Sequence, residues 1–413
     1  MPNKNLSEKL FKPKFNQPET STLMRRIPDI SPENRPNEQS PHWYRSLDKV
    51  MWLWQGVPYL DITDVLSRIA VSTHPRTAPN RLDTVAGYNS GNWNYEWSKQ
   101  AMIWQQKARG TPENNTLLAG QRWLNVANLF SIASYPHLRG DKLAEQAELL
   151  ANRAFDEACT RLPYERKLIE FSVEGGRLTG ALYLPTTLGG PYPTVLFCGN
   201  LGHFQSDYFQ LFQRYLAPAG FAMLCIDFPS VGYSAKWKLS YDCSKLHQQV
   251  LQQLATVPWV DHHKVVALGV LFGANIAVRL AYLEPSRLKG VISWNGLVHH
   301  MMMDDKSHLQ LTDMHKDILA SRLGLNHVPD SLLATEMTRY SLKIQGLLGR
   351  RRSQVPMLAM CTDHTIFGVQ DDAKLIASSS EQGKLIQINK RPLRNHINLS
   401  LKQMMEWIVK VID

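Results

Sequence analysis

The chain has 413 residues, of which 44% are hydrophobic and 20% are charged, and its formal net charge is +10. This composition is ordinary for a globular protein and excludes a largely disordered or fibrous chain, while the length favours more than one domain. Basic residues are thinly spread apart from the run at 350–352, and no aromatic ladder accompanies that run, so we expect a basic surface and no nucleic-acid-binding module.

The cysteines, the apolar segments and the missing cofactor motifs indicate where the protein is located and what it binds. The five cysteines form no C-x-x-C pair and lie mostly in apolar runs, which is typical of reduced, buried thiols in a cytoplasmic protein. Met1–Phe15 has no apolar core, so no signal peptide is expected. Val265–Leu283 is apolar but holds Asn275 and Arg279, which a strand, a turn and a helix explain better than a membrane span. Neither a P-loop nor an H-E-x-x-H motif occurs, so we expect no cofactor and no metal.

The first 162 residues divide into two segments with different sequence patterns. Residues 1–42 are rich in proline, asparagine and charge, which predicts a loosely ordered arm with at most one short helix. Residues 43–162 carry amphipathic patterns, clearest around Leu143–Phe155, and these predict an N-terminal helical domain. This segment is also dense in tryptophan. The rings could form a ligand cage or a partner surface, but we favour the interpretation that they fill the core of the helical domain.

After Leu162-Pro163 the pattern becomes that of strands. A hairpin is predicted at 167–184, with its turn at Glu174-Gly175-Gly176. Helical patterns separate most of the strands that follow, so residues 163–413 are predicted to form a mostly parallel, doubly wound α/β sheet. These strands are expected at Thr194–Cys198, Phe221–Ile226, Val265–Val270, Gly290–Trp294, Met357–Thr362 and Leu385–Ile388.

A long insert, residues 297–354, separates two of these strands. Helices are expected within it at Met314–Leu323 and Leu332–Leu348. Long insertions at the carboxyl edge of such sheets often cover a ligand site. The insert is therefore either a lid or plain packing onto the N-terminal helices.

One strand–turn–helix junction has the pattern of a nucleophile elbow. The strand runs into Gly269-Val270-Leu271-Phe272-Gly273, and a helix follows. In the α/β-hydrolase fold this junction reads G-x-S-x-G, because the strained turn needs its glycines and exposes the serine oxygen. Here Leu271 occupies the serine position. An alkyl group has no lone pair and no proton to lose, so ordinary acyl-enzyme catalysis at this position is excluded.

Other parts of the α/β-hydrolase pattern are present. A glycine-rich turn, Gly199–His203, follows the predicted strand that ends at Cys198. There we expect one oxyanion-hole amide, at Asn200 or Leu201, with the second at Phe272. Asp363 follows a strand and His396 comes just before a final helix, so the elbow, the acid and the histidine have the chain order that the fold requires. Such a pair could activate water directly against a bound ester.

A displaced nucleophile is the alternative to direct attack by water. Cys198, Ser206 and Ser230 are candidates near the carboxyl edge of the sheet, although none has a partner base visible in the sequence. Ser234 closes the D-x-x-x-x-G-x-S loop that begins at Asp227, and we expect it to be structural.

Several segments are more distinctive than the elbow. Together they resemble the FrsA family, the fermentation–respiration switch proteins classed among the α/β-hydrolases as esterases, over nearly the whole chain. They are Gly87–Trp97 (GYNSGNWNYEW), Ser134–Leu138 (SYPHL), Asp227–Ser234 (DFPSVGYS), Pro258–His263 (PWVDHH), Phe272–Leu280 (FGANIAVRL) and Tyr340–Gly346 (YSLKIQG).

The resemblance implies a cytoplasmic protein that hydrolyses carboxylic esters and binds a small ester or acyl ligand. It also implies binding to the glucose-specific IIA component of the phosphotransferase system, which would link sugar supply to respiration or fermentation. The family tends to carry arginine at the elbow, in a G-F-R-F-G pattern, from which Leu271 departs. An esterase is the leading hypothesis. The alternatives are a catalytically silent regulator that binds the IIA component through a hydrolase scaffold, and a sensor of small ligands in the old active-site pocket.

Overall fold

The computed structural model describes most of the chain. The described residues are Thr20, 26–27, 42–185, 189–303, 308, 311–326, 328–362, 369–388 and 393–413, with the backbone alone at 26–27 and 393–396. In this part of the chain, no helix combines the length and the apolar character that crossing a bilayer requires.

The centre of the fold is an eight-stranded sheet with the order β10-β9-β7-β6-β4-β5-β3-β2. Only the β2–β3 and β3–β5 pairs are antiparallel, so the predicted α/β-hydrolase architecture, mostly parallel and doubly wound, is confirmed. The strands are β2 (Glu165–Val173), β3 (Gly176–Leu184), β4 (Tyr192–Cys198), β5 (Ala222–Ile226), β6 (Val260–Val270), β7 (Gly290–Trp294), β9 (Met357–Thr362) and β10 (Gly383–Ile388).

Helices cover both faces of this sheet because successive strand residues point to opposite sides. In β4, Phe197 faces the core shared with α15 (Leu393–Ile412) and with the helical stretch around α7 (Phe209–Leu211). Its neighbour Leu196 faces the second core. Three helices close that side: α8 (Lys245–Gln253), α9 (Phe272–Leu283) and α14 (Val369–Ser378).

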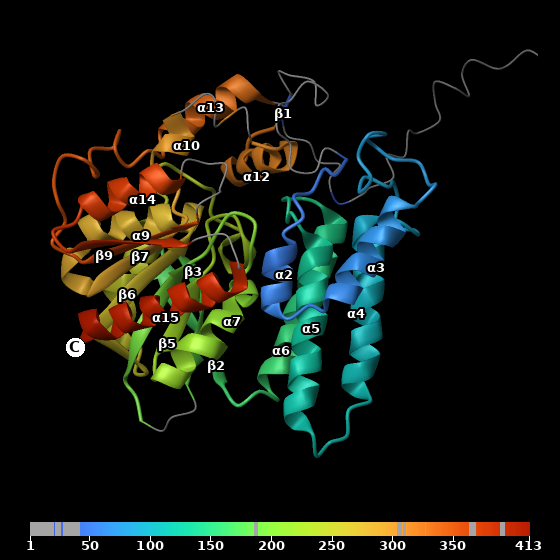
Figure 1. The fold of residues 1–413 in the computed structure, drawn as a ribbon, viewed down its shortest axis with the longest axis horizontal. Helices are drawn as coiled ribbons and strands as arrows, with labels where there is room; N and C mark the ends of the chain where they lie inside the picture. Colours follow the sequence, from blue (N-terminus) through green and yellow to red (C-terminus); the bar gives the residue numbers. More distant parts are fainter. Residues whose placement is uncertain are drawn as a thin grey trace, which may run out of the picture.

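The N-terminal segment is helical, and its long helices stand beside the sheet (Figure 1). Polar side chains cap their first turns: Asn92 accepts a hydrogen bond from the N–H of Tyr95, and Asp141 accepts from Leu143 and Ala144. These contacts fix where the helices begin. The helices are α2 (Lys49–Gln55), α3 (Tyr59–Ala70), α4 (Trp93–Arg109), α5 (Thr116–Ser134) and α6 (Lys142–Cys159).

Several tryptophans of this segment lie in the hydrophobic core. Trp93 and Trp97 are fully buried, and the ring centroid of Trp97 lies 5.4 Å from that of Trp52. Large rings packed in this way fill a core rather than line an open cage. The same core continues to Phe197 and Leu268 in the sheet. The chain therefore changes from helices to strands near Leu162-Pro163, but the helical segment and the sheet share one hydrophobic core.

The insert crosses the carboxyl edge of the sheet with α10 (His300–Met303), α12 (Asp313–Leu323) and α13 (Asp330–Thr338). Strand β8 (Val328–Pro329) pairs in parallel with β1 (Arg26–Ile27) from the N-terminal arm.

The prediction of a helix over Leu332–Leu348 is wrong in its extent, because the helix in this region, α13, ends at Thr338. The chain turns back beyond that point, because the N–H of Leu342 donates to the carbonyl of Val298 and Gly346 adopts a left-handed φ of 77°. Apolar residues in this stretch thus meet the core through turns, which helical spacing alone does not distinguish from a helix.

Candidate functional site

Leu271 is the single residue between β6 and α9, and its backbone is strained. Its φ of 51° and ψ of −117° lie outside the regions that a leucine favours, at a cost of about 1–3 kcal/mol. Two hydrogen bonds hold the turn: the Leu271 N–H donates to the Trp294 carbonyl over 2.9 Å, and the Leu297 N–H donates to the Leu271 carbonyl over 3.1 Å. The turn presents a partly exposed alkyl group at the carboxyl edge of the sheet.

The elbow glycines allow two close backbone contacts. A Cβ at Gly269 would lie 2.2 Å from the carbonyl oxygen of Gly273, and a Cβ at Gly273 would lie 2.4 Å from the carbonyl oxygen of Gly199. Real Cβ atoms do not approach backbone so closely, so glycine is required at both positions. The elbow therefore lies directly against the glycine-rich turn after β4.

The predicted oxyanion-hole residues Asn200, Leu201 and Phe272 come from these two contacting turns. Within the described part of the chain, none of their three N–H groups donates a hydrogen bond. The Leu201 carbonyl points to another partner, since it accepts from Nε of Arg322 over 2.8 Å. Free N–H groups at this edge can donate hydrogen bonds to the oxygen of a bound carbonyl, and their role as an oxyanion hole stays a prediction.

Arg322 holds this edge together from the insert helix α12. Its guanidinium is fully buried and donates to the His137 carbonyl over 2.8 Å, as well as to Leu201. The neighbouring Arg139 donates to Oγ of Ser230 over 3.2 Å. One side chain of the insert thus joins the glycine-rich turn to the N-terminal helical segment.

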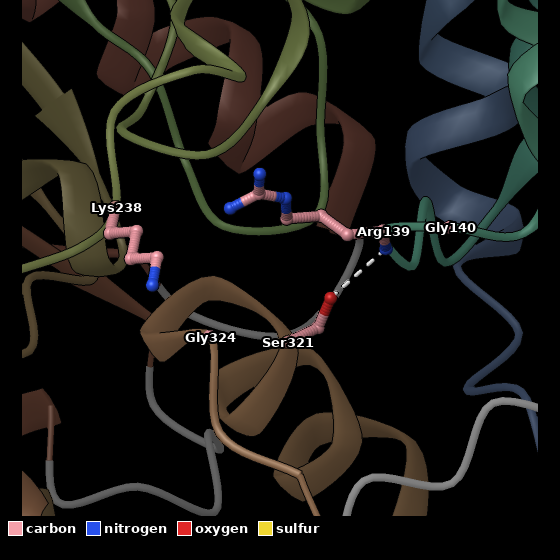
Figure 2. Close-up of a pocket in the computed structure, with 5 residues that line it drawn as sticks. All are labelled: Arg139, Gly140, Lys238, Ser321 and Gly324. Atoms are coloured by element: carbon pink, nitrogen blue, oxygen red, sulfur yellow. Dashed lines mark hydrogen bonds between the residues drawn. The ribbon is translucent and has the colours of Figure 1, made fainter.

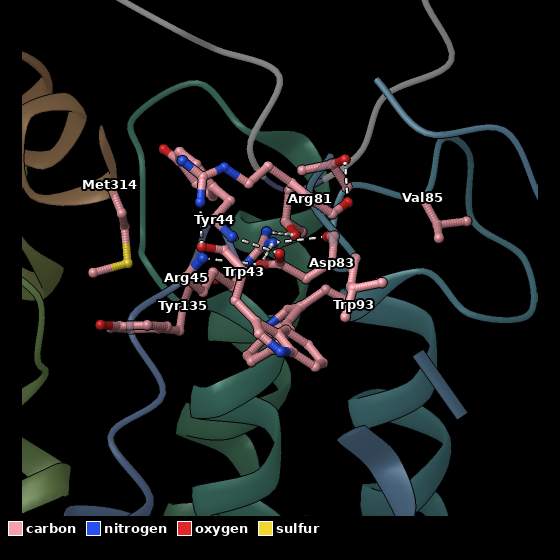
Figure 3. Close-up of polar contacts among 12 residues, drawn as sticks. Trp43, Tyr44, Arg45, Arg81, Asp83, Val85, Trp93, Tyr135 and Met314 are labelled. Carbon is pink, nitrogen blue, oxygen red and sulfur yellow. Dashed lines mark hydrogen bonds and ion pairs between the residues drawn. The ribbon is translucent and has the colours of Figure 1, made fainter. Parts of the chain in front are cut away.

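A second buried arginine, Arg45, organises the helical segment beside this edge (Figure 3). It pairs with Asp83 at 3.0 Å, donates from Nε to the Tyr135 carbonyl over 2.9 Å and lies 4.8 Å from the centroid of the Trp93 ring. The adjacent Tyr44 hydroxyl donates to Asp317 of α12 over 2.7 Å. These contacts fix the insert against the helical segment.

His203, the last residue of the glycine-rich turn, was not among the predicted site residues. Its side chain is 17% exposed, and its Nε2 lies 3.9 Å from Oδ2 of Asp48, the residue that caps α2. A histidine beside a carboxylate is a candidate base. The position of His203 after Gly199 and Gly202 was a usable signal, whereas nothing local to Asp48 indicates this contact.

The displaced nucleophiles find little support in the structure. Cys198 is fully buried, and burial raises the pKa of its thiol far above the usual value, which disfavours the reactive thiolate. Ser230 is buried and accepts from Arg139, which cannot act as a base, and Ser206 lies partly exposed in the turn after β4. The Ser234 hydroxyl donates to the Asp227 carbonyl over 2.8 Å, as a structural residue does.

The predicted acid and histidine are only partly placed. Asp363 lies outside the described residues, but Asn295 holds the residue before it, since Oδ1 of Asn295 accepts from the Thr362 N–H over 2.9 Å. His396 does not come before the final helix, as predicted, because α15 begins at Leu393; its side chain is outside the described set. The pairing of Asp363 with His396 stays a prediction. Among the described residues, no three His, Cys, Asp or Glu side chains are grouped as a metal site would require.

Asp227 anchors the loop after β5 and should make stability depend on pH. Its two carboxyl oxygens accept from the N–H groups of Gln205 and Tyr233, at 2.9 and 3.0 Å. Burial nevertheless raises its pKa to about 7. An unfolded Asp has a pKa of about 4, so the stabilisation from the bound proton is complete below that pH and is lost as the pH rises through 7.

We therefore expect the free energy of unfolding to fall between about pH 4 and pH 7, and Asp227→Asn to reduce this slope by up to about 1.4 kcal/mol per pH unit. Urea denaturation at several pH values measures the slope. Glu148, whose pKa burial also raises to about 7, keeps part of the slope in the variant. The same slope in both proteins would show that Asp227 is ionised throughout this range.

Comparison with known proteins agrees with this architecture. The family described as "Esterase FrsA-like" matches residues 1–412. Proteins named Esterase FrsA from Yersinia pestis (strain Pestoides F) and from Yersinia pseudotuberculosis (serotype O:1b, strain IP 31758) are each 52% identical over 409 residues, which is 98% of both chains.

Solved structures show the same fold at low sequence identity. The structure of 2,6-dihydroxy-pseudo-oxynicotine hydrolase has a TM-score of 0.69 at 18% identity, covering 88% of this chain and 96% of its own. That of AbyA5 has a TM-score of 0.57 at 19% identity, covering 72% and 81%. The match over residues 1–412 and the high identity to its relatives establish that the chain belongs to the FrsA-like esterase family.

Proposed function

We propose that this protein binds a small carboxylic ester at the carboxyl edge of its sheet and hydrolyses it by direct attack of water. The observation that carries the proposal is Leu271, which has the backbone of an elbow residue but an alkyl side chain. No acyl group can be transferred to that side chain. Any hydrolysis at this edge must then proceed without an acyl-enzyme at the elbow.

The steps need one base and one set of amides. A neutral imidazole takes a proton from water as the water oxygen bonds to the ester carbonyl carbon. The N–H groups of Phe272 and of Asn200 or Leu201 donate hydrogen bonds to the carbonyl oxygen and so stabilise the negative charge that develops on it. The carbon–oxygen bond to the leaving group then breaks, and the imidazolium returns its proton to the departing alkoxide. His396 is the base implied by chain order, and His203 is the one supported by its ion-pair distance to Asp48.

Release of p-nitrophenol from short-chain p-nitrophenyl esters tests this mechanism. We expect slow turnover by the wild type and its loss in His396→Ala with Asp363→Ala, or in His203→Ala if that histidine is the base. His299→Ala is the matched control, because that imidazole contacts the Ser341 hydroxyl in the insert. If the wild type is no faster than all of these variants while Leu271→Ser gains activity, the direct-water mechanism is wrong.

A second candidate function, favoured by the missing nucleophile itself, is regulation without catalysis. In this proposal the cytoplasmic protein binds the glucose-specific IIA component of the phosphotransferase system and so links sugar supply to respiration or fermentation. The net charge of +10 would suit an acidic partner. Isothermal titration calorimetry with the purified IIA component decides it, and the absence of binding would reject it.

A further inference from the structure

A cavity outside the elbow lies where three parts of the chain meet. Its volume is about 320 Å³, and it is lined by Arg139 and Gly140 from the helical segment, Lys238 from the segment after β5, Ser321 from α12 and Gly324, which caps the end of α12. Figure 2 shows the Arg139 and Lys238 side chains approaching each other from opposite sides above the end of α12. Two cationic side chains thus converge on one small polar space.

We infer that this cavity is a binding site for a phosphate group, carried by a small phosphorylated metabolite or as free inorganic phosphate. A guanidinium offers a planar fork of N–H donors, an ammonium adds a compact positive charge, and a serine hydroxyl can donate once more. This combination matches the oxygens of a phosphate. The volume falls at the lower end of the range for small-molecule sites, which leaves room for a small organic body beside the phosphate.

Hydrogen bonds hold one wall of the cavity. The Arg139 backbone N–H donates to Oγ of Ser321 over 3.0 Å, and its guanidinium donates to Ser230 over 3.2 Å, so one wall is held in place. Lys238 is exposed, and no ion pair or hydrogen bond of its side chain occurs among the described residues. Its ammonium is therefore available to an anion.

Glu145 and Glu148 are the described carboxylates of α6 that bear on this charge. Glu145 accepts from the Gly140 N–H over 3.2 Å and so is directed at the backbone. Burial raises the pKa of Glu148 to about 7, although the positive charge of Arg322 lowers it, so the negative charge of Glu148 is reduced at neutral pH. Neither carboxylate lines the cavity.

The cavity is separate from the elbow, and its proposed ligand does not depend on ester hydrolysis. It adjoins the predicted oxyanion turn through α12, since Ser321 faces the cavity and the next residue, Arg322, donates to the Leu201 carbonyl. A ligand held by Ser321 and Arg139 would stabilise the contacts that this turn of α12 makes.

Isothermal titration calorimetry of the full chain tests the site, with inorganic phosphate and glycerol 3-phosphate as separate probes at constant ionic strength. We expect saturable binding of the probe. Kd should rise about tenfold or more in Lys238→Gln, because this variant loses one charged hydrogen bond to the phosphate. Lys236→Gln is the matched control: it removes the same charge from the same segment but not from the cavity, and should leave Kd within about twofold.

The two probes distinguish the sources of the phosphate. Tighter binding of glycerol 3-phosphate identifies a phosphorylated metabolite, and equal binding identifies inorganic phosphate. Binding weaker than about 10 mM for both probes, an unchanged Kd in Lys238→Gln, or an equal loss in Lys236→Gln would each overturn the assignment.

Discussion

Replacement of Arg322 by methionine is expected to cost about 3 kcal/mol or more of the free energy of unfolding. Methionine keeps most of the apolar length of the side chain but removes the donors to the Leu201 and His137 carbonyls, both at 2.8 Å. A buried carbonyl that loses its partner costs about 1–3 kcal/mol, and the substitution leaves at least two of them unpaired. Urea denaturation followed by circular dichroism measures the loss.

Arg177→Met is the control for this substitution. Arg177 pairs with Glu170 on the surface, with its side chain 79% exposed, and such a pair contributes at most about 1 kcal/mol. A loss below about 1 kcal/mol in Arg322→Met as well would mean that water replaces the guanidinium at both carbonyls. Arg322 would then not be what holds the glycine-rich turn to the helical segment.

A single methyl group at Gly273 is expected to be about as damaging, at roughly 3 kcal/mol or more. In Gly273→Ala the new Cβ would lie 2.4 Å from the Gly199 carbonyl oxygen and 2.5 Å from that of Cys198. Both obstacles are backbone atoms, so a side-chain rotation cannot relieve the clash, and the elbow must move away from the glycine-rich turn. The change is measured by thermal and urea unfolding.

Gly110→Ala provides the comparison at a permissive site. Gly110 follows α4 with an ordinary φ of −81°, and a Cβ there would find only the Gln106 carbonyl oxygen at 3.4 Å. Its stability should change by less than about 1 kcal/mol. If Gly273→Ala were equally harmless, the two turns would not be in the close backbone contact that places the predicted amides together.

The elements that depend on local pattern could be predicted from the sequence. The apolar runs that end in Cys198 and Val270 each read as a buried strand, and the glycine spacing around Leu271 placed a tight turn between strand and helix. Such signals are local because burial and backbone strain are set within a few residues. The α/β-hydrolase architecture follows from the order of these elements.

The contacts that assemble the edge of the sheet could not be predicted in the same way. Arg322 reads as an ordinary basic residue near the end of a helix, and only the fold brings it to the Leu201 carbonyl. His203 and Asp48 lie in different segments, and their approach depends on how the helical segment packs. The helix expected through Leu348 failed for a related reason, since Leu342 is held by Val298 rather than by its own neighbours.

The shared hydrophobic core has a consequence for how the chain is made. The N-terminal helices, including α4 with Trp93 and Trp97, leave the ribosome early, but the apolar side chains that complete their core, such as Phe197 and Leu268, come from strands synthesised later. Until those strands arrive, the nascent helices carry an uncovered apolar surface of the kind that recruits chaperones or aggregates. Synthesis of the sheet, rather than of the helices, is then the step that commits the chain to its native state.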